Sequence, residues 1–346
     1  MLESPVLKAR RHAGATLVEA FGWSVPGSYS SAANEHAAVT QRFAVADRSY
    51  IGRLRINGND AIDLLDRLTT NRLTDLQEGH LMGTVFTSGK GRIIDLVILL
   101  RRGDHLLAFT GPETRKRIAE WIDFYTFAED VTVEDETEST AMLSLLGPHA
   151  ADAVDGLADL DLYQSAEMDV GGVRATVART DFAGLPGYDF VAPSADGDAI
   201  WTALVEQGAE PVGTDVLDLV RIENGIPAYG AELNEDHNPL EAGLKDFISF
   251  NKGCYVGQEV VARLDTYDKV QRHLVRLSWK TVQAISAGAA LFFDGKQVGA
   301  VTSAAASVSG AAEGLGYVRN AQAGQGTVLN ADGEVEVRVG EPVGRD

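Results

Sequence analysis

The pattern of apolar and turn-forming residues changes at His273. From there to the C-terminus, short apolar runs such as 274–279 and 335–339 alternate with glycine-bearing turns, and no helical pattern is convincing. Many short strands separated by such turns are typical of a β-sandwich or β-barrel. The sequence therefore predicts a small all-β domain at the C-terminal end.

The residues ahead of His273 mix helices with strands. Apolar residues at helical spacing predict helices, and apolar runs between turns predict strands. The predicted helices cover 31–43, 59–68, 113–125, 199–206 and 214–223, and the predicted strands cover 84–87, 92–100, 105–110, 141–146, 173–179 and 188–192. Because strands and helices do not alternate regularly, the pattern favours an α+β fold over a doubly wound parallel sheet. A chain of 346 residues is long enough for about two to three domains.

The charge balance limits the partners. Fifty acidic residues against 30 basic ones give a formal net charge of −20. Binding to nucleic-acid phosphates needs the opposite sign, so we expect no direct DNA contact, and direct tRNA contact is disfavoured. The same field repels an anionic membrane, and no apolar stretch reaches the ~18 residues that cross a bilayer. Glu19 interrupts the apolar run near the start and no cleavage site follows, so we expect a mature cytoplasmic N-terminus.

The most unusual run of the chain holds its only cysteine. It reads Asn251-Lys252-Gly253-Cys254-Tyr255-Val256-Gly257-Gln258-Glu259, and a helix is predicted from Gln258. A thiol near a lysine and just ahead of a helix start meets the conditions for a nucleophile, a metal ligand or a redox group. The alternative is a buried cysteine that packs as a small apolar group. The two flanking glycines favour a close turn that exposes the thiol.

The other candidate motifs give weaker evidence of a functional site than the cysteine run. One cysteine excludes an internal disulfide and an all-cysteine metal site, and no histidine motif for a metal or a cysteine hydrolase occurs, so no metal is predicted. The segment 88–91 is interpreted as a hairpin turn because its spacing fails that of a phosphate loop. Glu35-His36 and Asp236-His237 are interpreted as surface or capping pairs.

Asp189 stands between Tyr188 and Phe190, after a turn with two glycines and a proline. It either faces solvent or is a buried anion with a partner. A buried carboxylate can accept two parallel hydrogen bonds from an amidine-like edge, such as that of a pterin or a guanidinium.

The run 252–259 resembles the signature of YgfZ-type folate-binding proteins, which are relatives of the glycine-cleavage T-protein, an aminomethyltransferase. Weaker similarities to that superfamily follow in the expected order along most of the chain. They are Phe21–Pro26, Glu35-His36, Val45–Ser49, Asn57–Ala61, Gly147-Pro148, Arg221–Gly225 and Asn238–Leu244.

The resemblance implies an α+β protein with two interleaved α/β portions of the T-protein/YgfZ type and a C-terminal antiparallel β-barrel. Its domains would be 1–50 with 140–262, which binds folate, then 51–139, and the barrel at 263–346. The implied cofactor is tetrahydrofolate or a related reduced folate. The implied partners are iron–sulfur enzymes or their assembly factors, and bacterial relatives are linked to tRNA modification through an iron–sulfur enzyme.

The resemblance also implies residue roles. Cys254 would supply a thiolate that Lys252 favours, and Asp189 with Tyr188 would bind the pterin. The turn around the thiol would be shaped by Gly253, Tyr255, Gly257, Gln258 and Glu259.

Three positions depart from the aminomethyltransferase pattern. Arg72 stands where that enzyme has a catalytic aspartate, and a guanidinium cannot replace a proton-transferring acid. Leu217 stands at the position of a later arginine, and Asp189 is one methylene shorter than the usual glutamate. Pterin binding is therefore favoured over T-protein catalysis. The alternatives are a folate-dependent aminomethyl- or methyltransferase, and an interaction module whose folate site has decayed.

Overall fold

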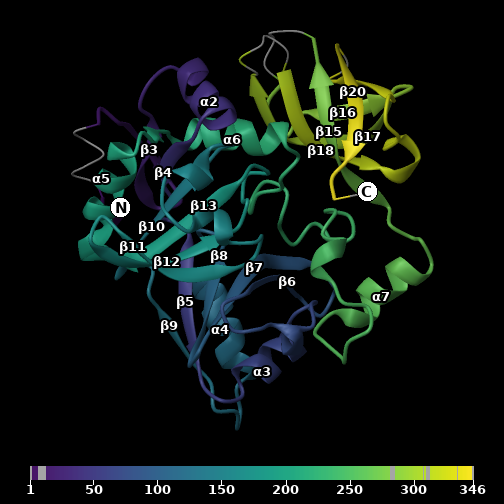
Figure 1. The fold of residues 1–346 in the computed structure, drawn as a ribbon. Coiled ribbons are helices and arrows are strands. Elements are labelled where there is room, and N and C mark those ends of the chain that lie inside the picture. The colour runs from purple at the N-terminus through teal and green to yellow at the C-terminus, as the bar shows by residue number, and fades with distance from the viewer. Residues whose placement is uncertain are drawn as a thin grey trace. The chain divides into compact units, whose positions relative to one another are not determined.

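The computed structural model describes residues 2–6, 13–280, 285–306, 308, 312–332 and 334–344 (Figure 1). Its contacts divide the chain into two compact units. Unit 1 comprises Met1–Leu65, Leu73–Gly83 and Val97–Leu217, and unit 2 comprises Asp66–Arg72, Thr84–Leu96 and Asp218–Asp346.

A six-stranded sheet forms the main layer of unit 1. Its order is β11 (Ser165–Val170), β12 (Val173–Arg179), β13 (Gly187–Pro193), β10 (Thr140–Leu146), β4 (Ala44–Asp47) and β14 (Glu210–Pro211). Helix α5 (Gly197–Glu206) packs against β10, β4 and β11, and helix α2 (Ala32–Gln41) packs against β4 and β14. The apolar residues between α5 and the sheet include Leu143, Leu145, Phe190, Trp201 and Leu204.

Two further sheets contain the remaining strands that precede the barrel. One has the order β1 (Leu2–Glu3), β3 (Trp23–Ser28) and β2 (Thr16–Ala20). The other has the order β6 (Leu81–Thr87), β7 (Ile93–Arg102), β8 (His105–Thr110), β5 (Gly52–Asn57) and β9 (Thr132–Asp135). Helix α4 (Arg115–Tyr125) covers β5 and β9 with Ile118 and Ile122 buried. The predicted hairpin is confirmed, because the segment 88–91 joins β6 to β7 and the Gly91 amide donates to the Ser88 carbonyl at 2.8 Å.

The C-terminal strands of unit 2 close into an antiparallel barrel, drawn in green to yellow in Figure 1. Its order is β15 (Arg272–Trp279), β18 (Ala312–Arg319), β17 (Lys296–Ala306), β16 (Ala290–Phe293), β19 (Val328–Ala331) and β20 (Val335–Pro342). Alternate residues such as Val275, Leu277 and Val318 fill one buried cluster. Leu274 and Tyr317 belong to a different cluster, as the alternation of side chains along a strand requires.

The remaining helices complete the list of elements. They are α3 (Ala61–Leu68), α6 (Thr214–Glu223) and α7 (Gln258–Thr266), with 3-10 turns at Leu73–Asp75, Ala150–Asp152, Leu157–Asp159, Ser194–Asp196, Lys245–Phe247 and Asn320–Gln322.

The predicted α+β fold class and the all-β C-terminal part are confirmed. All six predicted helices, including the one that begins at Gln258, and the six strands predicted ahead of His273 occur, with ends that differ by a few residues. The three-domain division stays a prediction. Within the described residues, no helix combines the length and the apolar character needed to span a membrane.

Candidate functional site

The loop that carries the cysteine is anchored at its start by Lys252. The side chain of Lys252 is 1% exposed, and its ammonium lies 3.3 Å from the Asp66 carboxylate. The ammonium donates to three backbone carbonyl oxygens, those of Asp66 at 2.5 Å, Thr69 at 2.9 Å and Asn71 at 2.5 Å. Burial lowers the pKa of Lys252, and the neighbouring Asp66 charge opposes that shift. Lys252 therefore ties the loop to the segment 66–71, and its predicted effect on the thiol stays a prediction.

A second anchor holds the end of the loop. The Val256 amide donates to the Arg67 carbonyl at 3.2 Å, and the Val256 carbonyl accepts from the Thr87 hydroxyl at 2.5 Å. Gly257 follows with φ of 86°, and a Cβ atom there would lie 2.6 Å from the Ser88 carbonyl oxygen. Gly253 differs, because its backbone lies outside the left-handed region and its surroundings are open to 4 Å. Of the two glycines that flank the thiol, only Gly257 is required by its backbone and its neighbours.

Cys254 lies between these anchors and is exposed. The prediction of an exposed thiol is confirmed, and the alternative of a buried apolar cysteine is wrong. The next residue, Tyr255, is buried, its ring lies 5.6 Å from the Lys252 ammonium, and burial raises its pKa to about 12. The Gln258 side chain donates to the Gly253 carbonyl at 3.3 Å, while Glu259 is exposed in the first turn of α7. The loop therefore presents one thiol from a backbone that is fixed on both sides.

Arg72 contacts the same loop. Its guanidinium donates to the carbonyl oxygen of Asn251, next to Lys252. Arg72 is therefore a cation that binds backbone and supports the cysteine loop, and its equivalence to the family's catalytic acid stays a prediction.

Asp189 is a buried anion with partners, which was one of the two alternatives. On β13 it faces Ser144 of β10 in register. Its Oδ1 atom accepts from the Arg48 guanidinium at 3.0 Å and from the Ser144 hydroxyl, and its Oδ2 atom accepts from the Thr180 hydroxyl at 2.7 Å. The Arg48 guanidinium also lies 3.6 Å from the centre of the Phe182 ring.

These contacts limit what Asp189 offers a ligand. A carboxylate has about four lone-pair positions, and three are in use. One acceptor position remains on Oδ2 of this side chain, which is 4% exposed, so a pterin N–H group could donate a single hydrogen bond there. The parallel pair of bonds considered from the sequence would require Arg48 or Ser144 to move.

Tyr188 does not join Asp189. It packs with Phe190 and Trp201 in the core beneath α5, and burial raises its pKa. Neighbouring residues of a strand point to opposite faces, so the two predicted pterin contacts do not converge. Asp189 belongs to unit 1 and Cys254 belongs to unit 2.

Glu35-His36 and Asp236-His237 are interpreted from the sequence as surface or capping pairs, and the surface alternative is wrong for Glu35 and His237 because both are buried. The capping alternative fits Glu35, since the amides that it binds lie just ahead of helices α2 and α6. The Glu35 carboxylate is 2% exposed and accepts from three backbone amides, those of Tyr29, Ser30 and Gly213, at 2.6–2.8 Å. His237 is 8% exposed and stacks on Tyr317, with ring centres 3.4 Å apart. The Gly213 amide and the Tyr317 ring are distant in sequence from Glu35 and His237, so no local pattern could indicate these two contacts.

The burial of His237 predicts a pH-dependent stability. Burial lowers the pKa of His237 to about 4, so between about pH 6.5 and 4 the unfolded chain binds more protons than the folded protein. Stability is therefore lost as the pH falls through this window, by up to about 3 kcal/mol from this residue. Urea unfolding at several pH values should show a flatter profile for His237→Phe, which keeps a flat ring. His149→Phe is the control because His149 is exposed, and equal profiles for wild type and His237→Phe would contradict the prediction.

Comparison with known proteins identifies the family. The profile of the GCVT N-terminal domain family matches residues 6–252, and the chain belongs to this family. An aminomethyltransferase of Rubrobacter xylanophilus is 32% identical over 97% of this chain and 92% of its own length. An aminomethyltransferase of Bacillus pumilus is 30% identical over 97% of this chain and 94% of its own length.

A solved structure shows the same fold. The glycine cleavage system aminomethyltransferase T from Bartonella henselae superposes with a TM-score of 0.88, at 24% identity, over 98% of this chain and 97% of that one. The expected T-protein fold, with mixed α/β sheets and an antiparallel barrel, is confirmed.

Proposed function

We propose that this protein is a YgfZ-type, tetrahydrofolate-binding accessory protein that supports the assembly or repair of iron–sulfur enzymes, including tRNA-modifying ones. The observation that carries the proposal is the exposed Cys254 on a loop whose backbone is held on both sides. A thiolate is the reactive form of cysteine and a metal ligand. One thiolate cannot supply the usual four ligands of a cluster, so any cluster bound here would be shared with the client protein.

Residue 72 supports an accessory role over catalysis of aminomethyl transfer. Transfer to folate needs an acid that exchanges a proton, and a guanidinium cannot serve as one. The Arg72 side chain instead donates to the Asn251 carbonyl. The guanidinium at this position is therefore engaged by the cysteine loop, through the Asn251 carbonyl.

Reduced folate fits the site in one respect. Asp189 retains one acceptor position on Oδ2, which would hold a pterin N–H group, while Arg48 balances the buried charge. A bound reduced folate supplies a carrier of one-carbon units. Asp189 and its partner Arg48 would orient the bound folate.

Folate binding and the thiol are tested separately. Tetrahydrofolate at 100 times its Kd should stabilise the wild-type protein by ~2.7 kcal/mol in thermal unfolding, and Cys254→Ser should show the same stabilisation. Cys254→Ser should nevertheless fail to restore iron–sulfur enzyme activity in a strain that lacks the family member, because an alcohol does not replace a thiolate. Full restoration by Cys254→Ser would exclude the thiol from the function, and the absence of any stabilisation would exclude folate.

A second candidate is a folate-dependent aminomethyltransferase. It is supported by relatives of that name that align with 97% of this chain. Turnover of an aminomethyl donor with tetrahydrofolate distinguishes the two. We expect no turnover from the wild type, and measurable turnover would replace the accessory proposal with the transferase.

The Arg72→Asp variant tests whether an acid at position 72 is enough to give transferase activity. It restores the acid that the family resemblance implies and removes the bond to Asn251. We expect weak turnover above the wild type in the same assay if the rest of the scaffold persists. Turnover equal to that of Arg72→Asn, the uncharged control, would show that the acid alone does not restore the chemistry.

A further inference from the structure

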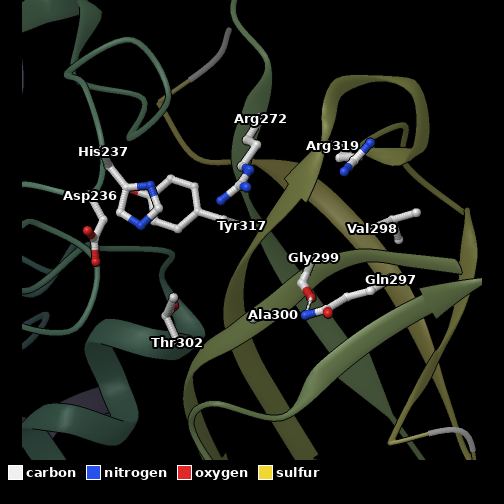
Figure 2. A pocket seen from close by; sticks show the side chains of 10 residues that line it. All are labelled: Asp236, His237, Arg272, Gln297, Val298, Gly299, Ala300, Thr302, Tyr317 and Arg319. Carbon is white, nitrogen blue, oxygen red and sulfur yellow. Dashed lines mark hydrogen bonds between the residues drawn. The ribbon is translucent and has the colours of Figure 1, made fainter.

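Unit 2 contains a pocket of about 600 Å³ against the outer face of the barrel (Figure 2). Strand β17 lines it with residues 297–300, and β15 and β18 contribute Arg272 and Arg319. The stacked rings of His237 and Tyr317 form a flat wall, as Figure 2 shows. Its volume lies in the range of pockets that hold small organic ligands, roughly 300–1,000 Å³.

Two arginines of this pocket stand directly opposite each other. Arg272 of β15 pairs in register with Arg319 of β18 across an antiparallel ladder. Like charges in directly opposed positions destabilise a sheet. Both side chains are exposed, and among the residues that the structure describes neither guanidinium has an ion pair or a side-chain hydrogen bond.

The chain has many carboxylates that could pair with these arginines. Its acidic residues outnumber its basic ones by 50 to 30, yet the one acidic side chain in the pocket lining is Asp236. The pocket therefore has a net positive charge inside a strongly acidic protein. Arginine forks bind carboxylate and phosphate oxygens in pairs, and such charge-assisted bonds are about twice as strong as neutral ones.

We propose that this pocket binds a small organic anion, with carboxylate or phosphate oxygens bridging Arg272 and Arg319 and an apolar part against the His237–Tyr317 stack. The anion relieves the repulsion between the two guanidinium groups. This inference does not depend on the proposed function, because it uses neither Cys254 nor Asp189.

The test is calorimetric titration at low ionic strength with two probes, citrate for carboxylates and inorganic pyrophosphate for phosphates. We expect saturable binding of at least one probe, and the tighter probe identifies the oxyanion class. Arg272→Gln and Arg319→Gln should each weaken binding about tenfold or more. Arg338→Gln is the matched control, because Arg338 belongs to the same barrel but pairs with Glu336 away from the pocket lining.

A second measurement separates a ligand site from a structural role. Without any anion, Arg319→Gln should unfold at a temperature no lower than the wild type, because it removes a like-charge pair. The charge-preserving Arg319→Lys should retain part of the binding if Arg319→Gln does not fold. The proposal is overturned if neither probe binds, or if Arg338→Gln weakens binding as much as the pocket variants.

Discussion

Replacement of Lys252 by methionine should lower the free energy of unfolding by about 3–5 kcal/mol, the range for breaking a buried ion pair from one side. The variant removes the ammonium that lies 3.3 Å from the Asp66 carboxylate, whose side chain is 16% exposed. It also leaves the carbonyl groups of Asp66, Thr69 and Asn71 without the donor that they share. Urea unfolding at neutral pH measures the loss directly.

The control for this variant is Lys245→Met. Lys245 also pairs with an aspartate, because its ammonium lies 3.5 Å from the Asp265 carboxylate, but its side chain is 64% exposed. Exposed pairs contribute about 0–1 kcal/mol, so this change should be small. Equal losses for the two lysine variants would show that Lys252 does not anchor the loop.

The second large effect is expected for Gly257→Ala, with a loss of about 2–4 kcal/mol. The backbone at Gly257 has φ of 86°, where a side chain costs ~1–3 kcal/mol, and the clash with the Ser88 carbonyl adds to that cost. The hairpin turn or the loop must shift to admit a methyl group. Thermal or urea unfolding of the purified variant gives the magnitude.

Gly253→Ala is the matched control in the same loop. It adds the same methyl group where nothing lies within 4 Å and where the backbone is outside the left-handed region. Its effect should stay within about 0.5 kcal/mol. If both glycine variants lose similar stability, the close approach of Gly257 to the hairpin does not determine the loop.

The main elements of the fold could be predicted because their signals are local. The hairpin of β6 and β7 shows as two apolar runs around a Gly-Lys-Gly turn, and the barrel shows as many short runs between glycines. Strands such as β4 and β11 lack such signals. β4 has only four residues, two of them alanine, and β11 mixes acidic with small residues, so both become strands through their neighbours in the sheet.

The candidate site was predictable only where it depends on adjacent residues. The exposure of Cys254 follows from its own loop, whose glycine at 257 adopts a conformation that other residues avoid. The role of Lys252 could not be seen, because its partners in the segment 66–71 are about 180 residues away. The alternation of side chains along a strand could have shown that Tyr188 and Asp189 point to opposite faces of β13. That local signal contradicts the prediction that both bind one pterin.

The double anchoring of the cysteine loop has a consequence for engineering. Residues 251–258 acquire their shape from two other segments, 66–72 and 87–91, through bonds and close approaches at both ends. A chimaera that receives only the eight-residue signature would contain the same residues, but its loop would lack the contacts that fix the backbone conformation. We expect a relative to fold with this loop only when segments 66–72, 87–91 and 251–258 are exchanged together. Functional recombinants should therefore inherit all three segments from the same parent.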